Sequence, residues 1–338
     1  MKQPQAKEDD LTYAATTEGY VLPVIDVTHP RFAVPDDPQG VRVLYEEFAR
    51  QERRRQLFPK FIMRLMLRSA ARRSLLVKAM FSSDAKFLDG MSTYVMKLGE
   101  ANLPPPFDGP MDRRLAASPH IGLLRLRTQQ TARLVAEGLA PDLAAAENAP
   151  LHLINIGGGP AIDSMNSLIL LNRRRPDLIR RPIVIHVLDG DPAGPFFGAN
   201  ALAALKAEGC PLSGLNIVLE HKTYNWNDPA SLAQLVRELT SQGAIVAASS
   251  EGALFEYGSD EAIIMNLRAL VAAGTGARLV AGSVTSADAF RRRMIAMTKF
   301  KLIPRGIEGF APLVTRAGAK IAQIETAGLS QQVLLRAA

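Results

Sequence analysis

Three consecutive glycines stand directly after an apolar run near the middle of the chain. The run covers residues 151–156, and the glycines are Gly157, Gly158 and Gly159. Glycine lets the backbone turn sharply and approach a ligand closely, because no Cβ is in the way. A helix is expected over residues 161–171, and its first N–H groups are free to bind a polar or anionic group. The segment is therefore a candidate ligand cradle.

Acidic residues are placed to complete such a site. Asp163 falls in the first turn of the expected helix, where its charge suits the helix dipole. Asp189 follows the next apolar run, residues 183–188, and Asp191 comes two positions later. The carboxyl end of that strand would lie beside the glycine turn, where a carboxylate can accept both hydroxyl groups of a ribose. A nucleoside-containing ligand would fit this combination.

The second half of the chain alternates short apolar runs with helix-length segments. The expected strands cover residues 151–156, 183–188, 215–220, 244–248 and 277–281, and the segments between them include 231–242 and 260–273. This alternation predicts an α/β fold with a parallel sheet and helices on both faces. Two last runs, 320–326 and 331–335, flank a turn and predict a closing antiparallel hairpin.

The first 150 residues have a different pattern. Residues 1–40 contain extended pieces, and helices are expected over 41–57, 58–81 and 121–139. Three prolines, Pro104 to Pro106, interrupt this region because they cannot continue a helix. We therefore predict an N-terminal, mainly helical domain over residues 1–118 and a second domain over 119–338.

The composition restricts the class of protein. The 338 residues are 47% apolar and 22% charged, as in an ordinary globular chain. The single Cys210 rules out a disulfide framework and suggests a reducing compartment. No apolar run approaches the roughly 20 residues of a membrane span, and the polar N-terminus does not resemble a signal peptide. We expect a cytoplasmic protein without integral membrane contact.

One segment supplies the net charge of +7. Residues 51–80 hold nine basic residues against Glu52 alone, so the remainder is close to neutral. This uneven distribution disfavours a nucleic-acid footprint over the whole protein. The segment has helical periodicity, and three interpretations stay open: a solvated helix, a lid or dimer helix, and a helix on an anionic membrane surface.

The glycine turn departs from the nicotinamide dinucleotide pattern. In G-x-G-x-x-G, Gly157 and Gly159 fit, but Ile162 occupies the third position. Asp189 follows Gly157 by 32 residues, whereas that pattern places its acid about 20 residues on. Both departures disfavour a nicotinamide oxidoreductase, which stays as an alternative class.

The stretch from Asn155 to Ala161 resembles the glycine-rich turn of the class I S-adenosylmethionine-dependent methyltransferases. The resemblance covers about residues 150–338. It implies a seven-stranded, mostly parallel Rossmann-like sheet with an antiparallel C-terminal hairpin, and S-adenosyl-L-methionine as cofactor. Asn155 stands where that family usually has an acid, and Ala161 where it often has a third glycine. Asn155 can form hydrogen bonds but brings no charge to the ammonium group of the cofactor.

The resemblance also implies which residues bind the cofactor. The glycine turn would hold the methionine part, and Asp189 the ribose, with Asp191 as a nearby substitute. The residue after the third strand would contact the adenine, which points to Asn225 or to stacking by Trp226. The complete expected set is Asn155, Gly157, Gly158, Gly159, Asp163, Asp189, Asp191, Asn225, Trp226 and Ser250.

Methyl transfer from a sulfonium mainly needs orientation and the exclusion of water, and it needs a base only if the acceptor must lose a proton. His221 and Glu251 follow the third and fourth expected strands, at the same sheet edge. They are the candidate catalytic residues, His221 as a base and Glu251 as a cofactor or substrate contact. No metal-ligand pattern occurs, so no metal is expected.

The acceptor is expected to bind at the N-terminal region. Five large side chains there could close over a small organic molecule or form the core of the region itself: Tyr13, Tyr20, Phe81, Met91 and Tyr94. A small-molecule O- or N-methyltransferase is the preferred function, and the same helices could form a homodimer. The alternatives are a protein or RNA methyltransferase that docks through residues 51–80, and a non-catalytic or membrane-surface binding protein with a degenerate cofactor site.

Overall fold

A computed structural model describes residues 10–57, 69–81, 90–272, 276–296 and 300–338, together with Ile62 and Leu65. Part of the helix expected over 58–81 lies outside the described residues. In the described part the expected single helix is wrong, because a turn at Arg72 and Arg73 separates residues 69–71 from α3 (Leu75–Phe81), and the Ser74 hydroxyl accepts the Val77 N–H at 2.9 Å at the start of α3. The other N-terminal elements are β1 (Tyr13–Ala15), β2 (Val21–Pro23), α1 (Pro38–Gln56), α4 (Gly90–Lys97), η1 (Glu100–Asn102) and α5 (Pro110–Ala116).

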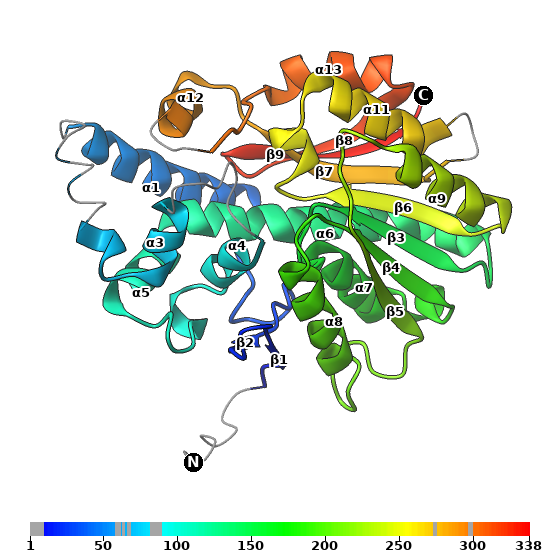
Figure 1. The fold of residues 1–338 in the computed structure, drawn as a ribbon, viewed down its shortest axis with the longest axis horizontal. Coiled ribbons are helices and arrows are strands. Elements are labelled where there is room, and N and C mark those ends of the chain that lie inside the picture. The colour runs from blue at the N-terminus through cyan, green and yellow to red at the C-terminus, as the bar shows by residue number, and fades with distance from the viewer. Residues whose placement is uncertain are drawn as a thin grey trace.

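A seven-stranded sheet forms the centre of the molecule (Figure 1). Its strands are β3 (Leu151–Ile156), β4 (Ile183–Leu188), β5 (Ile217–Lys222), β6 (Ile245–Ser250), β7 (Leu279–Thr285), β8 (Ala319–Thr326) and β9 (Ser330–Ala337). They lie in the order β5-β4-β3-β6-β7-β9-β8. The first five are parallel, and β9 runs antiparallel to both β7 and β8. The predicted fold class, with its closing hairpin, is confirmed.

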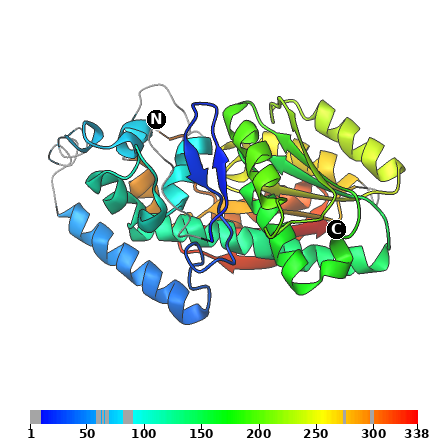
Figure 2. The same cartoon turned by 90° about the horizontal axis from the view of Figure 1, so that it is seen from below.

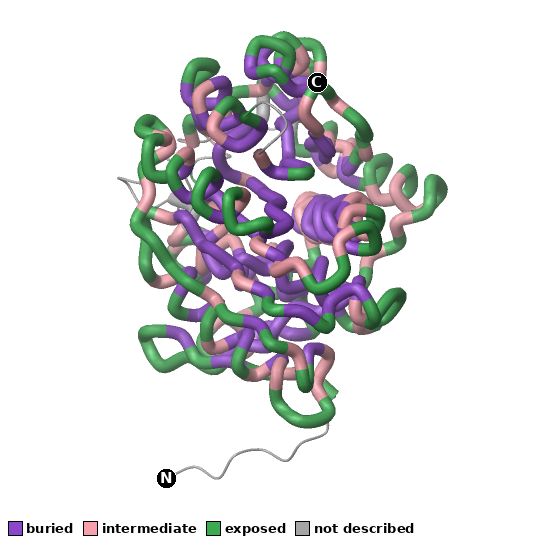
Figure 3. Tube along the Cα trace, turned by 90° about the vertical axis from the view of Figure 1, so that its right-hand side faces the viewer, coloured by how far each residue is buried: buried purple, intermediate pink, exposed green. Residues whose placement is uncertain are grey.

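Helices cover both faces of this sheet. One face carries α6 (Pro119–Ala145), α7 (Ile162–Arg174), η2 (Pro176–Ile179) and α8 (Ala193–Leu205), and the other carries α9 (Ala230–Ser241), α10 (Leu254–Tyr257), α11 (Asp260–Val271) and α13 (Gly306–Arg316). A short helix, α12 (Ala289–Ala296), precedes α13. Alternate residues of β3 enter different cores, since Leu153 packs with the first group and Ile154 with the second. The central strands are accordingly buried along their length (Figure 3).

Two strands reach further along the chain than their apolar runs predicted. β5 extends to Lys222 and β7 to Thr285, because these polar ends still pair with neighbouring strands: Lys222 with Leu188, and Thr285 with Ser330. Strand membership follows the hydrogen-bond ladder, which continues through polar residues such as Lys222 and Thr285.

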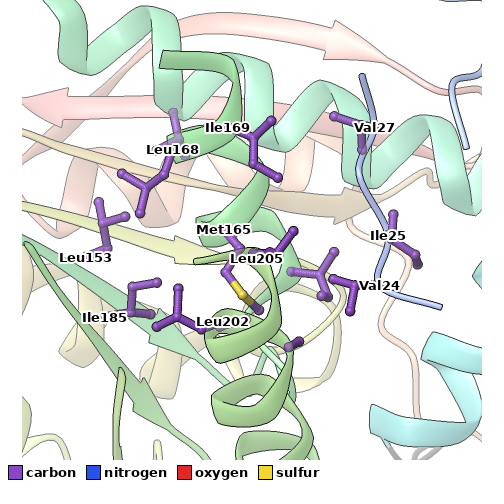
Figure 4. Close-up of a cluster of buried hydrophobic side chains, with 14 of the residues drawn as sticks. Val24, Ile25, Val27, Leu153, Met165, Leu168, Ile169, Ile185, Leu202 and Leu205 are labelled. Atoms are coloured by element: carbon purple, nitrogen blue, oxygen red, sulfur yellow. The ribbon is translucent and has the colours of Figure 1, made fainter. Parts of the chain in front are cut away.

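The segment that follows β2 lies along α7 and α8, where Val24, Ile25 and Val27 pack with side chains of both helices (Figure 4). Asn166 of α7 accepts a hydrogen bond from the Val27 N–H at 2.7 Å and donates one to the Ile25 carbonyl at 2.9 Å. The Tyr94 hydroxyl of α4 donates to the Pro23 carbonyl at 2.5 Å. The N-terminal segment is thus held between α4 and the sheet domain.

The long helix α6 belongs to both parts of the molecule. It contacts α1, α4 and α5 of the N-terminal region, and also α7, β7 and β9. Figure 2 shows the blue and cyan N-terminal helices gathered at one end, beside the green strands and helices of the sheet. The division at residue 118 stays a prediction. Within the described part of the chain, no helix has the length and apolarity needed to cross a membrane.

Candidate functional site

A cavity of about 570 Å³ lies where β3, β4 and β6 end. Its volume falls within the roughly 300–1,000 Å³ typical of small-molecule sites. The glycine turn and the loop after β4 form one wall, and residues 224–227 and 251–253 form others. From the N-terminal region, five of the described residues line the cavity: Ile25, Gly90, Thr93, Tyr94 and Lys97. The cavity therefore sits at the carboxyl edge of the sheet, between the two parts of the molecule.

The glycine turn leaves no room for side chains at its start. Gly157 has a φ of +65°, and a Cβ built there would lie 2.8 Å from the Ala253 Cβ and 3.1 Å from Cζ3 of Trp226. Gly159 and Ala161 also lie in the left-handed region, both with a φ of +54°. The chain consequently turns within a few residues from β3 into α7, and its backbone faces the cavity.

Asp189 joins the loop after β4 to the glycine turn. Its Oδ2 accepts a hydrogen bond from the Gly159 N–H at 2.9 Å, and its Oδ1 accepts one from the Asp191 N–H at 2.9 Å. Asp191 in turn accepts from the N–H of Ala193, the first residue of α8, at 3.0 Å. An ionised carboxylate has about four acceptor positions, so Asp189 can still receive the hydroxyl groups of a ligand.

Asn155 and Asp163 form a buried pair behind and beside this turn. The Nδ2 of Asn155 donates to Oδ1 of Asp163 at 2.7 Å, and it lies 3.2 Å from the Ser249 hydroxyl. Asp163 lines the cavity, whereas Asn155 does not. Burial raises the pKa of the Asp163 carboxyl, and the nearby Glu251 carboxylate adds to the rise while Ser249 and Lys97 oppose it.

Glu251 belongs to a buried network of four charges. It contacts Lys97 of α4 at 2.6 Å and Arg127 of α6, and Arg127 also contacts Glu256 at 3.2 Å. Burial alone would raise the pKa of Glu251, but the charges of Arg127 and Lys97 outweigh it and lower the pKa to about 2. Burial lowers the pKa of Lys97, because it disfavours the charged ammonium, and the negative charge of Glu251 partly opposes this shift. Glu251 is therefore a fixed anion.

Lys97 and Arg127 were not anticipated from the sequence. A signal was present in each case, because both are charged residues that interrupt the buried face of a helix. Arg127 follows the fully buried Leu126, and Lys97 ends the buried stretch from Tyr94 to Met96. Long charged side chains are almost never fully buried unless paired, so such positions indicate an internal ion pair. The partner cannot be identified from local sequence.

The loop after β5 brings an aromatic ring to the cavity. Trp226 and Asn225 both line it, and the Trp226 ring lies against Gly157. Asn266 of α11 anchors this loop: it donates to the Trp226 carbonyl at 2.7 Å and accepts from the Tyr224 hydroxyl at 2.6 Å. The loop that carries the ring is thereby fixed beside the glycine turn, and the adenine contact of Trp226 stays a prediction.

Three of the expected site residues do not line the cavity. Asn155 is fully buried, and Ser250 uses its hydroxyl to join the Ile156 carbonyl to the Leu254 N–H, at 3.0 and 2.9 Å. His221 is exposed, and its Nε2 lies 2.9 Å from the backbone oxygen of Asp189. Asn155 and Ser250 therefore support the lining from behind, and His221 lies outside the group of residues that meets there.

The large N-terminal side chains expected near the acceptor lie in the cavity wall, on the surface and against the core. Tyr94 lines the cavity, but its hydroxyl is bound to the Pro23 carbonyl. Tyr13 and Tyr20 are 43% and 37% exposed, and Met91 packs against the large core. The side chain of Phe81 lies outside the described residues. Among the described residues, no cluster of His, Cys, Asp or Glu could hold a metal ion.

No protein-family model matches this chain, and no curated protein matches its sequence. Among solved structures, a possible exported protein from Bordetella parapertussis is 15% identical over 89% of this chain and 99% of its own, with a TM-score of 0.55. An O-methyltransferase from neocarzinostatin biosynthesis, solved with S-adenosylmethionine and 2-hydroxy-5-methyl naphthoic acid, is 19% identical over 68% of this chain, with a TM-score of 0.37. The N,N-8-amino-8-demethyl-D-riboflavin dimethyltransferase RosA from Streptomyces davawensis is 14% identical over 77% of this chain, with a TM-score of 0.38.

These matches concern the fold alone. The match covers 61% of the neocarzinostatin enzyme and 71% of RosA. The observed strand order, with β9 inserted antiparallel between β7 and β8, is that of the class I S-adenosylmethionine-dependent methyltransferases. The chain has this fold.

Proposed function

We propose that the protein is an S-adenosylmethionine-dependent methyltransferase that methylates an oxygen or nitrogen of a small organic molecule. The observation that carries the proposal is one cavity, at the carboxyl edge of a class I methyltransferase sheet, that brings together the glycine turn, Asp189 and Trp226. These groups lie in different loops, and the fold places them around a single space.

The lining fits each part of the cofactor. The Trp226 ring offers a face for the adenine, and the Asp189 carboxylate offers acceptors for the ribose hydroxyls. A Cβ at position 157 would collide with Ala253 and with the Trp226 ring. Because this residue is glycine, the backbone can lie against the methionine part of the cofactor. Asn225 borders the same region. We assign cofactor contact to these residues and a supporting role to Asn155 and Ser250.

The chain contributes position rather than a base. When bound, S-adenosyl-L-methionine supplies a methyl group already activated on its sulfonium. Glu251, with a pKa of about 2, is a poor proton acceptor, and no histidine is among the described residues that line the cavity. We therefore propose that the acceptor is oriented in the cavity and that its walls exclude water. Glu251 acts here by holding Lys97 and Arg127 in place.

The covering elements favour a small acceptor. Ile25, Tyr94 and Lys97 border the cavity on the N-terminal side and so restrict the space beside the cofactor in which an acceptor can bind. A protein or RNA methyltransferase that docks through residues 51–80 is the alternative, and Arg53, Arg54 and Arg55 are indeed exposed at the end of α1. However, none of the described residues of that segment lines the cavity.

The only tryptophan of the chain provides a direct test, because Trp226 lies in the cavity wall. We expect S-adenosylmethionine and its demethylated product to change the intrinsic fluorescence saturably, with calorimetry giving one site per chain. NADH should not compete. Sedimentation with anionic liposomes at low salt tests the membrane-surface alternative. If the protein does not bind the cofactor but binds anionic liposomes in a salt-sensitive way, the proposed methyltransferase function is wrong.

A further inference from the structure

One residue of the cavity wall, Asp163, has a buried carboxylate oxygen without a hydrogen-bond partner. Asp163 is 3% exposed, and its Oδ1 is held by Asn155, but its Oδ2 makes no hydrogen bond. An unpaired buried acceptor is costly, and burial raises the pKa of this carboxyl. A buried carboxyl group of this kind in the wall of a ligand cavity suits a ligand that carries a positive charge.

The other acidic side chains around the cavity already have hydrogen-bond or ion-pair partners. Glu251 is bound by Lys97 at 2.6 Å and by Arg127. Each oxygen of Asp189 accepts a backbone N–H, and Asp191 accepts the N–H of Ala193. Among the described acidic residues that line the cavity, Asp163 is therefore the one with a buried oxygen that lacks a hydrogen-bond partner.

Asn155 explains how this carboxylate is positioned. Its Nδ2 donates to Asp163 at 2.7 Å and to the hydroxyls of Ser164 and Ser249 at 3.3 and 3.2 Å. An aspartate at position 155 would place two carboxylates at hydrogen-bond distance, and such a pair cannot be fully ionised. The amide at 155 thus allows an ionised acid at 163, eight residues further on.

We infer that Asp163, which lines the cavity, receives the α-ammonium group of the bound cofactor on its carboxylate, and that Asn155 is the positioning residue that holds it. The inference rests on the proposed function. The family resemblance places the carboxylate that contacts the ammonium group at the end of β3. In this protein we place that carboxylate in the first turn of α7. The N-terminal end of a helix also favours that charge.

Three adenosyl thioethers separate this role from a structural one. S-adenosylhomocysteine carries the ammonium and carboxylate groups, S-adenosyl-3-thiopropylamine keeps only the ammonium, and 5′-methylthioadenosine has neither. In Asp163→Asn we expect the affinity for the first two to fall roughly tenfold to a hundredfold, as for a lost charge-assisted contact. Affinity for 5′-methylthioadenosine should stay within about twofold. The control is Asp177→Asn, an exposed carboxylate that pairs with Arg175 on the surface.

Exchanging the two residues completes the test. Asn155→Asp alone should weaken S-adenosylhomocysteine binding. The double variant Asn155→Asp/Asp163→Asn should recover stability, because one carboxylate again faces one amide, but not affinity, because position 155 does not line the cavity. An equal loss for all three ligands in Asp163→Asn, or no loss for any, would overturn the inference while leaving the proposed function intact. If the unchanged protein binds none of the three, the proposed function itself fails, and this inference with it.

Discussion

The backbone N–H of Gly159 donates a hydrogen bond to Oδ2 of Asp189 at 2.9 Å. This contact ties the glycine turn after β3 to the loop after β4, so the residue expected to bind a ribose also sets the shape of the turn. The two loops are therefore one unit, and a change in either should affect the whole cofactor site.

Asp189→Asn keeps the shape of the side chain but removes its charge and one acceptor. We expect the affinity for 5′-methylthioadenosine to fall at least tenfold, because the ribose hydroxyls lose a charged acceptor. The free energy of unfolding should fall by only about 1 kcal/mol, for one weakened backbone contact. Calorimetry and urea denaturation measure the two effects, with Asp228→Asn, another loop carboxylate that accepts a backbone N–H, as control. Unchanged affinity would remove Asp189 from the site.

Gly157→Ala should abolish cofactor binding. Its new Cβ would press on Ala253 and on the Trp226 ring, in addition to the strain of a left-handed backbone. Gly243→Ala separates the two effects, because Gly243 has a φ of +77° and nothing lies within 4 Å of its built Cβ. Both variants should lose about 1–2 kcal/mol of stability from strain, but only Gly157→Ala should lose binding. Normal titration of Gly157→Ala by fluorescence would count against the assignment.

Glu251→Gln should destabilise the protein by roughly 3–5 kcal/mol, because it leaves buried Lys97 without the carboxylate that it contacts. The control Glu261→Gln breaks an exposed pair with Arg316 and should cost less than about 1 kcal/mol. Urea denaturation distinguishes these values. A loss as small as that of the control would show that the network does not stabilise the fold.

The same network predicts sensitivity to acid. The pKa of Glu251 is lowered in the folded protein to about 2 from an ordinary value of 4.5. Its contribution to stability is thus complete above pH 4.5 and is lost as the pH falls toward 2. Glu251→Gln should flatten this part of the stability profile. Parallel profiles for variant and unchanged protein would contradict the assignment.

Asp163 should have the opposite effect on stability. Its pKa is raised in the fold, so the ligand-free protein loses stability as the pH rises from the ordinary value of 3.8 through the folded pKa. Asp163→Asn should remove this loss and be at least as stable at pH 7, although it binds the cofactor more weakly. Thermal unfolding without and with S-adenosylhomocysteine measures both properties. A strongly destabilised variant would indicate that the carboxylate is structural.

Local pattern predicted the elements that build the cofactor site. The apolar runs at 151–156 and 183–188 are β3 and β4, and the glycines between β3 and α7 form the expected turn. These features follow from near neighbours in the chain: strand burial repeats every two residues, and only glycine adopts such turns without strain. The position of Asp189 at a strand end could be read in the same way.

Which charges meet inside the protein was decided by tertiary packing. Glu251 joins Lys97 and Arg127, which lie 154 and 124 residues away in the chain, and Asn166 holds a segment 139 residues before it. No local periodicity encodes such pairs, because the low-dielectric interior that makes a charge need its partner forms only when distant helices pack together. Asp163 could be placed in the first turn of its helix from the sequence. That its second carboxylate oxygen lacks a hydrogen-bond partner is visible only in the folded protein, because the surrounding groups come from distant segments.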